Sequence, residues 1–296
     1  MGRTLLRGIC VAGIRIVIES PPALPWDLPE GPLTRFRVPA HDPDAVIGVR
    51  VGIPEAPAQQ SVHYDSEGGI FDVAREGDDW VFALRVRGEL QRVARFDAAF
   101  RTGEVVVHPE SFYAREAHYP LAYPLDELLV FHRLALQGNL LIHACGVVRD
   151  GRALLFTGPS GAGKTTIARR MLEVGGCSVL SDDRIAIRAD ADGFRVHGTP
   201  WHGDAPLSRA DSARLAGIYA IHQTRTLAPL ALSGVEAATA VLGNAFVPIH
   251  DRVAAARILE LAEQLVNQVP ITRLGCPNDA SVVDYVWGHP ARASAA

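Results

Sequence analysis

One segment of the chain constrains its fold more than any other. Residues 158–165 read Gly-Pro-Ser-Gly-Ala-Gly-Lys-Thr, a full match to the pattern GxxxxGK[ST], between an apolar run and a helix-like run. Glycines at these positions let backbone N–H groups turn toward a phosphate at the positive end of a helix dipole. In such a loop the lysine reaches the β- and γ-phosphates and the next hydroxyl binds Mg²⁺. The segment predicts a strand–loop–helix unit that binds a nucleoside triphosphate with magnesium.

The expected nucleotide contacts come from this loop and from the first turn of the helix. Lys164 is the expected cation for the phosphates, and Thr165 is the expected magnesium ligand. The full set of expected nucleotide-binding residues is Gly158, Pro159, Ser160, Gly161, Ala162, Gly163, Lys164, Thr165 and Thr166.

The basic residues support this interpretation. Of the 29 basic residues, Lys164 is the single lysine and the others are arginine, a bias that a GC-rich genome would produce. A guanidinium is a planar fork, whereas an ammonium is a compact point charge on a flexible stem. A phosphate-binding loop accommodates the compact cation. Phosphate binding therefore explains why this one position has lysine in spite of the compositional bias toward arginine.

Composition argues against several classes of protein. The formal net charge of −4 and the pI of about 6.3 provide no general attraction to nucleic acid or to a membrane surface. No apolar run approaches the roughly 20 residues that span a bilayer. Near the N-terminus, Arg15 interrupts the apolar run, and the alternation over residues 11–19 is typical of a strand rather than of a signal peptide. The four cysteines form no CxxC pair, so we expect a cytoplasmic protein without a disulfide framework or a zinc site.

The residue pattern divides the chain into a β-rich N-terminal module, 1–122, and a second domain, 123–296. In the module, strand-like runs are separated by turn signals such as Gly77-Asp78-Asp79, and a proline-rich connection follows the first run. The expected strands of the module are 45–53, 69–74, 80–86 and 104–108.

The second domain predicts an α/β core. Pro124 suits the first position of a helix, and Asp150-Gly151 predicts a tight hairpin between two apolar runs. The expected helices are 124–138, 164–172, 234–242, 252–269 and 278–287. The expected strands are 140–148, 153–157, 178–181, 184–188, 194–197 and 217–222.

Two common classes of phosphate-loop protein lack their motifs here. The NKxD motif that specifies guanine needs a second lysine, which the chain does not have. Residues 190–193 formally fit DxxG, but a hairpin turn explains them better. A transporter ATPase needs LSGGQ and a long apolar strand ending in Asp-Glu, and the sequence contains neither.

Two adjacent carboxylates, Asp182 and Asp183, follow Lys164 by 18 and 19 residues at the end of a short strand. One carboxylate can hold Mg²⁺ directly or through water, and another can accept the proton of an acceptor hydroxyl. Since adjacent strand residues point to opposite faces, the two are expected to differ in role. The alternative is a solvated turn paired with Arg184. His143 lies in the strand expected beside that of the loop, where a histidine is usually a satisfied core residue.

Residues 143–183 resemble the catalytic core of HPr kinase/phosphorylase, the serine kinases whose fold is related to phosphoenolpyruvate carboxykinase. The likeness rests on His143-Ala144 opening a hairpin, on the loop 158–165, and on Asp182-Asp183 followed by Arg184. It implies that Asp182 is the base facing the acceptor hydroxyl and that His143 polarises it. Asp183 and Thr165 would bind magnesium, and Lys164 would act on the phosphates of ATP.

The resemblance implies a fold class: α/β, with a P-loop nucleotide-binding core of the HPr kinase/phosphoenolpyruvate carboxykinase type preceded by a small β-rich N-terminal domain. One segment departs from the bifunctional family, whose acidic signature is replaced here by Gly198-Thr-Pro-Trp-His-Gly-Asp204. This segment resembles the shorter HPr-kinase-like proteins, including kinases that modify lasso-peptide precursors. The departure argues against the phosphorylase half-reaction and against HPr as the substrate. His202 or Asp204 would replace the missing ligand, or else the segment is a tight loop with Trp201 in the core.

The leading hypothesis is a Mg-ATP-dependent serine kinase that acts on a peptide or small protein, with a biosynthetic precursor peptide as the first choice. The alternatives are a small-molecule kinase and a nucleotide-binding regulatory module without transfer activity. We expect no nucleic-acid or membrane partner, and since relatives of this type form rings, the resemblance also allows a homo-oligomer. Candidates for stabilising the developing charge are Arg184, Arg209, Arg214, Arg225 and Arg273.

Overall fold

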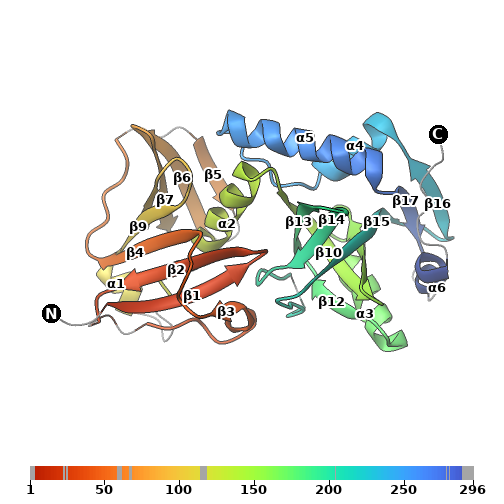
Figure 1. Ribbon diagram of the computed structural model, residues 1–296, viewed down its shortest axis with the longest axis horizontal. Helices are drawn as coiled ribbons and strands as arrows, with labels where there is room; N and C mark the ends of the chain where they lie inside the picture. The colour runs from red at the N-terminus through yellow and green to blue at the C-terminus, as the bar shows by residue number, and fades with distance from the viewer. Residues whose placement is uncertain are drawn as a thin grey trace. The chain divides into compact units, whose positions relative to one another are not determined.

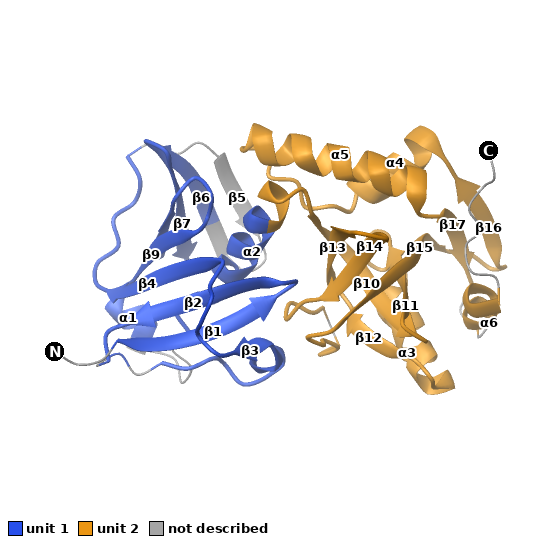
Figure 2. Cartoon of the chain, in the orientation of Figure 1, with its two compact units in different colours: residues 1–133 blue, residues 134–296 orange. Residues whose placement is uncertain are grey.

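The chain divides into two units, and the division falls inside a helix. The structure is a computed structural model that describes residues 4–22, 24, 26–58, 62–66, 69–113, 119–203, 205–277, 279 and 281–288. Unit 1 is Met1–Arg133 and unit 2 is Leu134–Ala296 (Figure 2). The boundary expected from the sequence lies just before helix α2 (Leu125–Leu136), whereas the two units divide within that helix.

Unit 1 contains a mixed sheet of nine strands within its described residues (Figure 1). The strand order is β3-β1-β2-β4-β9-β8-β7-β6-β5, with β4 parallel to both β2 and β9 and the other pairs antiparallel. The strands are β1 (Leu5–Val11), β2 (Ile14–Ser20), β3 (Arg37–Val38), β4 (Ala45–Val51), β5 (Val62–Ser66), β6 (Gly69–Glu76), β7 (Asp79–Val86), β8 (Glu89–Phe96) and β9 (Thr102–Val107). The helical elements are η1 (Pro32–Phe36), α1 (Pro109–Tyr113) and the greater part of α2.

The four strands expected in this part of the chain are confirmed as β4, β6, β7 and β9. The apolar run near the N-terminus is a hairpin rather than one strand, because Ala12 and Gly13 have φ of 52° and 78° and turn the chain between β1 and β2. Strand β8 was not predicted, since Arg92 and Arg95 interrupt its apolar pattern. Its buried residues nevertheless include Val93 and Ala94.

An aromatic cluster fills part of the interior of unit 1. Phe82, Phe96 and Phe100 lie within 6.0 Å of one another, centroid to centroid. His132 of α2 stacks on Phe100 at 4.6 Å, with its Nδ1 2.7 Å from the Leu128 carbonyl oxygen. Such ring pairs stabilise beyond the apolar area they bury. The predicted helix is confirmed, and it contributes this histidine to the core.

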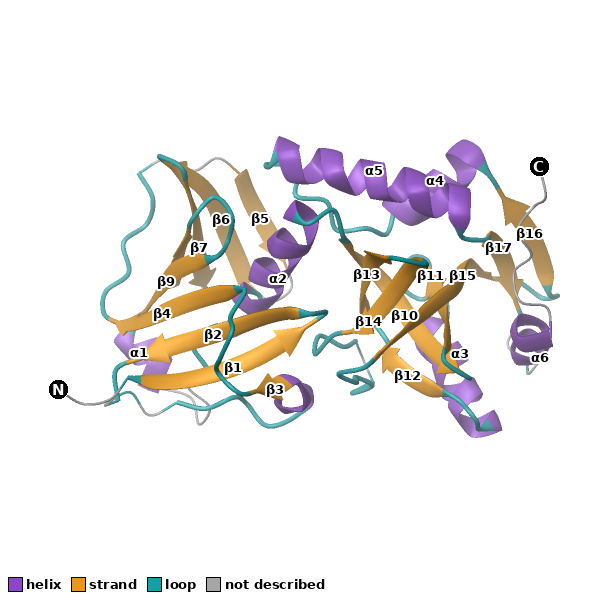
Figure 3. Ribbon diagram, viewed as in Figure 1, coloured by secondary structure: helices purple, strands orange, loops and turns teal. Residues whose placement is uncertain are grey.

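Unit 2 contains the second sheet, of eight strands in the described residues, with helices on both sides (Figures 1 and 3). Its strands are β10 (Leu140–Arg149), β11 (Arg152–Thr157), β12 (Ser178–Ser181), β13 (Arg184–Asp190), β14 (Gly193–Gly198), β15 (Ser212–Gln223), β16 (Ala228–Leu232) and β17 (Ile271–Cys276). Its helices are α3 (Lys164–Val174), α4 (Gly234–Leu242), α5 (Arg252–Gln268) and α6 (Ser281–Gly288), which follow the C-terminal end of α2.

The strand path of unit 2 runs β11-β10-β13-β14-β15-β17-β16, and β12 pairs with β10. It also closes on itself, because β15 pairs with β14 through its first residues and runs parallel to β11 along its length. Further along, β15 is parallel to β17. The loop after β11 and the end of β15 are therefore neighbours, and this arrangement forms the frame of the site described below.

The hairpin expected at Asp150-Gly151 is confirmed. Both residues have positive φ, 51° and 72°, as a two-residue hairpin turn requires. Strands β10 and β11 pair in register from Arg149 and Arg152 at the turn to Ala144 and Thr157 at the far end. The Thr157 hydroxyl also donates to the His143 carbonyl oxygen at 2.9 Å. The register of one hairpin thus places His143 beside the strand that leads into the glycine-rich loop.

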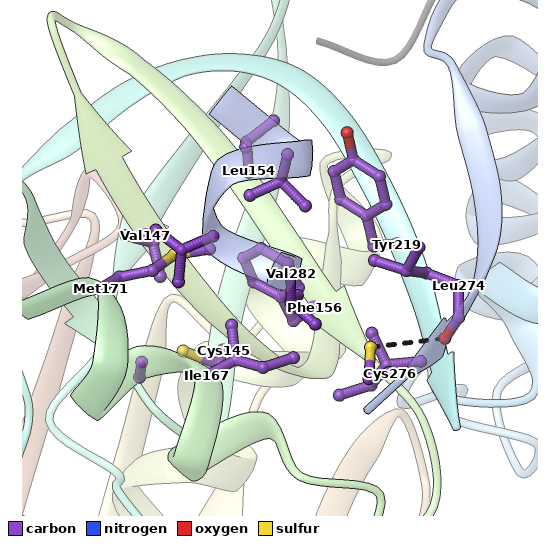
Figure 4. Packing of buried hydrophobic residues seen from close by; sticks show 14 of the residues in the cluster. Cys145, Val147, Leu154, Phe156, Ile167, Met171, Tyr219, Leu274, Cys276 and Val282 are labelled. Carbon is purple, nitrogen blue, oxygen red and sulfur yellow. Dashed lines mark hydrogen bonds between the residues drawn. The ribbon is translucent and has the colours of Figure 1, made fainter. Parts of the chain in front are cut away.

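One core cluster joins α3 and α6 to the strands of unit 2. It includes Cys145 and Val147 of β10, Phe156 of β11, and Met171 of α3. Figure 4 shows side chains from these elements, with Tyr219 of β15 and Val282 of α6, converging in one place. The cluster fixes the helix that follows the loop against the strands on which the other site residues lie.

The two sheets and the helices make a mixed α/β protein, so the coarse form of the expected fold class is confirmed. The second expected hairpin (β13 and β14) and the short strand before the two aspartates (β12) are also confirmed. Strands β16 and β17 were not predicted. Within the described residues, no helix is both long and apolar enough to cross a membrane.

Candidate active site

The glycine-rich loop joins β11 to α3 and has the backbone geometry that glycines allow. Gly158, Gly161 and Gly163 have φ of 150°, 77° and 105°. A Cβ at Gly158 would lie 2.6 Å from the Ile221 carbonyl oxygen, whereas one at Gly161 or Gly163 would meet no atom of the described residues within 4 Å apart from its chain neighbours. The loop therefore packs against β15 at Gly158 and is open at the other two glycines, where a ligand can approach the backbone.

A substitution at Gly158 tests this packing. We expect Gly158→Ala to lower the free energy of unfolding by about 1–3 kcal/mol, because it combines backbone strain with a contact that the neighbouring strand cannot relieve. Thermal and denaturant unfolding would measure the change. Gly161→Ala is the matched control: its φ of 77° also strains a side chain, but the position is open. An equal loss in both variants would contradict the role of the Ile221 contact.

Helix α3 begins directly after the loop without a side-chain cap. Its N-cap is Gly163, and the first backbone bond of the helix runs from the Ile167 N–H to the Gly163 carbonyl. The N–H groups of the preceding turn have no intrahelical acceptor, and they coincide with the positive end of the helix dipole. The Gln223 amide donates to the Gly161 carbonyl at 2.8 Å and thereby helps to hold the loop from β15.

Lys164 lies at the start of α3, with its ammonium folded back onto the loop. The residue is 7% exposed, and its Nζ donates to the carbonyls of Gly158 at 2.7 Å and Pro159 at 3.2 Å. Burial lowers the pKa of this ammonium, while the negative charge of Asp183 acts in the opposite direction. An ammonium has three N–H donors, so the same group can hold the loop and still donate to a phosphate oxygen.

The two adjacent carboxylates have different surroundings. Asp182 is 2% exposed, and its two oxygens accept from the backbone N–H groups of Gly203 at 3.1 Å and Ala205 at 3.2 Å. Burial raises the pKa of Asp182, although these two hydrogen bonds oppose the shift. In this arrangement the carboxyl ties the end of β12 to the segment after β14.

Asp183 instead belongs to a cluster with His143 and Arg184. Its Oδ1 lies 2.9 Å from His143 Nδ1, and its Oδ2 accepts from the Arg184 guanidinium. Burial acts to raise the pKa of Asp183, but His143, Arg184 and Lys164 outweigh it and leave that pKa below its ordinary value. The carboxyl is therefore ionised near neutral pH and acts electrostatically on the lysine of the loop.

The tautomer of His143 decides which of its neighbours it binds. The same Nδ1 also lies 3.0 Å from Arg184 Nη1, and an arginine can only donate. When Nδ1 carries a proton it donates to Asp183, and when it does not it accepts from Arg184. The histidine can therefore exchange partners inside the cluster.

A further residue at this cluster, Phe246, was missed by the sequence analysis. The Arg184 guanidinium lies 4.6 Å from the centroid of the Phe246 ring. The segment around Phe246 is attached to β10 through backbone bonds, since Phe246 donates to Leu141 and His143 donates to Asn244. Phe246 follows an amphipathic helix by several residues, and no local sequence pattern connects it to a residue so far away in the chain. Gln223 was missed for the same reason.

The structure brings together only part of the expected site. The residues of the loop, together with His143, Asp183 and Arg184, belong to one region through the contacts and charges above. Thr165 is half-buried and Thr166 is exposed on the first turn of α3. His202 is exposed, with its Nδ1 2.8 Å from the Gly203 carbonyl oxygen, and Asp204 lies outside the described residues. Trp201 is buried, as the alternative of a tight loop expected.

The other candidate arginines have different contacts. Arg214 donates to the Asp192 carbonyl at 3.0 Å, and Arg273 lies 3.9 Å from Glu236. Arg184 is the candidate that contacts Asp183. No group of three or more His, Cys, Asp or Glu side chains with the spacing of a metal site occurs in the part of the chain that the structure describes.

These features define a mixed α/β protein whose second unit combines a glycine-rich strand–loop–helix segment, a buried lysine and a His–Asp–Arg cluster. The chain belongs to the family described as SynChlorMet cassette protein ScmC, whose family model matches residues 125–276, just over half of the 296-residue chain. The match spans α2 to β17 and includes every residue of the site just described. Comparison with curated proteins found no match.

Proposed function

We propose that the protein is a Mg-ATP-dependent kinase that transfers the terminal phosphate to a serine-type hydroxyl of a peptide or small protein. One observation carries the proposal: the one lysine of the chain lies at an uncapped helix N-terminus, donates to the glycine-rich loop and interacts with the charge of the Asp183 carboxylate. Phosphoryl transfer to a hydroxyl needs cationic and N–H groups at the phosphates and a carboxylate at the hydroxyl. On this proposal unit 2 is a P-loop core of the HPr kinase/phosphoenolpyruvate carboxykinase type.

The loop fits the phosphates of ATP. Its open glycines leave space beside the backbone, and the N–H groups at the start of α3 have no acceptor within the helix. For magnesium, the candidate ligands are the Thr165 hydroxyl and the Asp183 carboxylate. Such a small set suits Mg²⁺, which usually binds through one or two protein groups, phosphate oxygens and water. When bound, magnesium would neutralise charge on the phosphates and orient them.

The residues of the chain then have distinct roles. The loop amides and Lys164 hold the phosphates and stabilise the charge that develops during transfer. Asp183, kept ionised by its neighbours, accepts the proton of the acceptor hydroxyl. His143 and Arg184 hold that carboxylate in place, and Phe246 holds Arg184. In-line positioning of the hydroxyl and the phosphate supplies the rest of the rate enhancement.

This proposal moves the role of base, which the resemblance implies for Asp182, to Asp183. Asp182 is buried with both oxygens on backbone N–H groups, so we assign it the task of anchoring the segment around Gly203. Asp183 is 20% exposed at its side chain and contacts the histidine that the resemblance pairs with the base. A base must reach the hydroxyl that it deprotonates, which favours Asp183. The same carboxylate remains the candidate magnesium ligand beside Thr165.

A precursor peptide is the first choice of acceptor. The segment from Gly198 resembles that of kinases that modify lasso-peptide precursors. The matching family is described as a cassette protein, so on this proposal a precursor peptide would be sought among the neighbouring genes. A small-molecule acceptor and a regulatory module without transfer activity are the alternatives that the experiment must separate.

The decisive experiment is direct. The purified full chain is incubated with Mg-ATP labelled at the γ-phosphate and with candidate precursor peptides encoded beside its gene, and the peptides are analysed by mass spectrometry. We expect one phosphate per peptide on a serine, none after its replacement by alanine, and none with EDTA. Calorimetry with Mg-ATP runs in parallel. Folded protein that binds no Mg-ATP would overturn the proposal, and binding without transfer to any hydroxyl would support a regulatory module.

A further inference from the structure

A cavity of about 220 Å³ lies beside the glycine-rich loop, between α3, α6 and the ends of β15 and β17. Its lining includes Ala162 and Gly163 of the loop, so the cavity is continuous with the segment proposed to hold the phosphates. It continues along α3 past Thr166 to Arg170, one helical turn further on. If a molecule binds the loop through its phosphates, the portion attached to those phosphates would therefore lie in this cavity.

The wall of the cavity has a polar and an apolar part. The polar part includes Thr166, Arg170 and Gln223, and the apolar part includes Cys276, Val282 and Val283. Binding sites for cofactors are commonly of this kind, with apolar walls and a few polar groups that fix orientation. A flat heterocycle with polar edges, attached to a sugar, matches both parts.

The charges of the residues that line the cavity argue against the binding of a second anionic group there. Its charged lining groups are Arg170 and Asp279, which interact with each other, so the cavity has no excess of positive charge. The Cys276 thiol, at the apolar part, donates to the Leu274 carbonyl, and burial raises its pKa to about 11. It is therefore neutral near pH 7 and behaves as an apolar group. An uncharged ligand portion fits these surroundings better than a phosphate does.

We propose that this cavity binds the nucleoside of the phosphate donor, with α6 as its outer wall. The inference rests on the proposed function and adds to it the position of the base and sugar. The acceptor belongs elsewhere, since His143, Asp183 and Arg184 are not among the residues that line the cavity. Gln223 joins the two parts of the site, because it lines the cavity and also donates to the Gly161 carbonyl of the loop.

The test compares two probes that share the phosphates and differ in the nucleoside. Calorimetry measures the binding of Mg-ATP and of Mg-tripolyphosphate to the full chain and to variants that fill the cavity. Val283→Trp fills it from α6, and Thr224→Trp fills it from the half-buried residue after β15. Val174→Trp is the matched control, since Val174 is 62% exposed at the end of α3 and does not line the cavity.

We expect wild-type protein to bind both probes, with Mg-ATP the tighter. Filling the cavity should raise the dissociation constant of Mg-ATP by about tenfold or more and leave that of Mg-tripolyphosphate unchanged. Retained tripolyphosphate binding also shows that the variant is folded, and if Val283→Trp does not fold, Thr224→Trp decides. Unchanged Mg-ATP affinity in a folded, filled variant would overturn the inference and leave the proposed function standing. Failure of wild-type protein to bind either probe would overturn the proposed function and the inference with it.

Discussion

Lys164→Met is expected to reduce phosphotransfer by about 10²–10³-fold or more, the usual effect of removing one donor that stabilises developing charge. The chain has no second lysine that could substitute, and the ammonium is held at the start of α3 by two loop carbonyls. Methionine fills similar space without the charge. The measurement is the initial rate of peptide phosphorylation at saturating Mg-ATP, with unfolding curves as the check on folding.

Lys164→Arg is the informative companion variant. It keeps the positive charge but replaces a compact ammonium with a wide planar fork. The buried position leaves little room for the fork, since Lys164 is 7% exposed. We therefore expect arginine to restore little of the activity that methionine loses. Near-normal transfer by a folded Lys164→Met protein would show that the loop does not hold the reacting phosphate.

Asp183→Asn is expected to lower the rate of transfer by about 10²–10⁴-fold, as the loss of a general base does, while the protein remains folded. The asparagine keeps the shape of the side chain and one acceptor oxygen but cannot take a proton. If the carboxylate acts mainly through magnesium, the magnesium concentration needed for half-maximal activity should rise as well. Rates measured across a magnesium titration separate the two roles.

Asp182→Asn is the matched control, because it makes the same change one residue away. Here an NH₂ group would face one of the two backbone N–H donors, from Gly203 or Ala205, and leave it without an acceptor. We expect a loss of about 1–3 kcal/mol in the free energy of unfolding. Folded Asp182→Asn protein should retain much of its transfer activity. The reverse result, an inactive Asp182→Asn and an active Asp183→Asn, would restore the roles that the resemblance implies.

Local sequence patterns predicted the elements of unit 2 that carry the site. The hairpin at Asp150-Gly151 and the short strand before Asp182 have signals that act within a few residues, namely turn chemistry and apolar alternation. Strand β16 (Ala228–Leu232) was missed because four of its five residues are exposed at the edge of the sheet, so it lacks the alternation of a half-buried strand. Strand β17 lies between helix α5 and the loop to α6, and Pro270 directly before it obscures the pattern.

The candidate site, too, could be predicted from the sequence only in part. The roles of the loop and of the aspartate pair could be proposed from the sequence, because each motif consists of consecutive residues. The environment of each aspartate could not, since it depends on the amides of Gly203 and Ala205 and on the partner of His143. Alternation along a strand predicts opposite sides for adjacent residues, but Asp182 and Asp183 lie between β12 and β13, outside both strands. It does not indicate which side is the interior.

The tight turn at Asp150-Gly151 has a consequence for where this protein tolerates changes in length. Exposed turns usually accept extra residues, and nothing local forbids an insertion there. Yet pairing in a hairpin has a period of two, so a shift by one residue reverses the face on which each side chain lies. Because β10 also pairs with β13 beside Asp183, that shift would fall on β11 and move the Thr157 hydroxyl away from the His143 carbonyl. A single residue inserted at this exposed turn is therefore expected to displace the glycine-rich loop from the cluster around His143, and with it to disturb the candidate site.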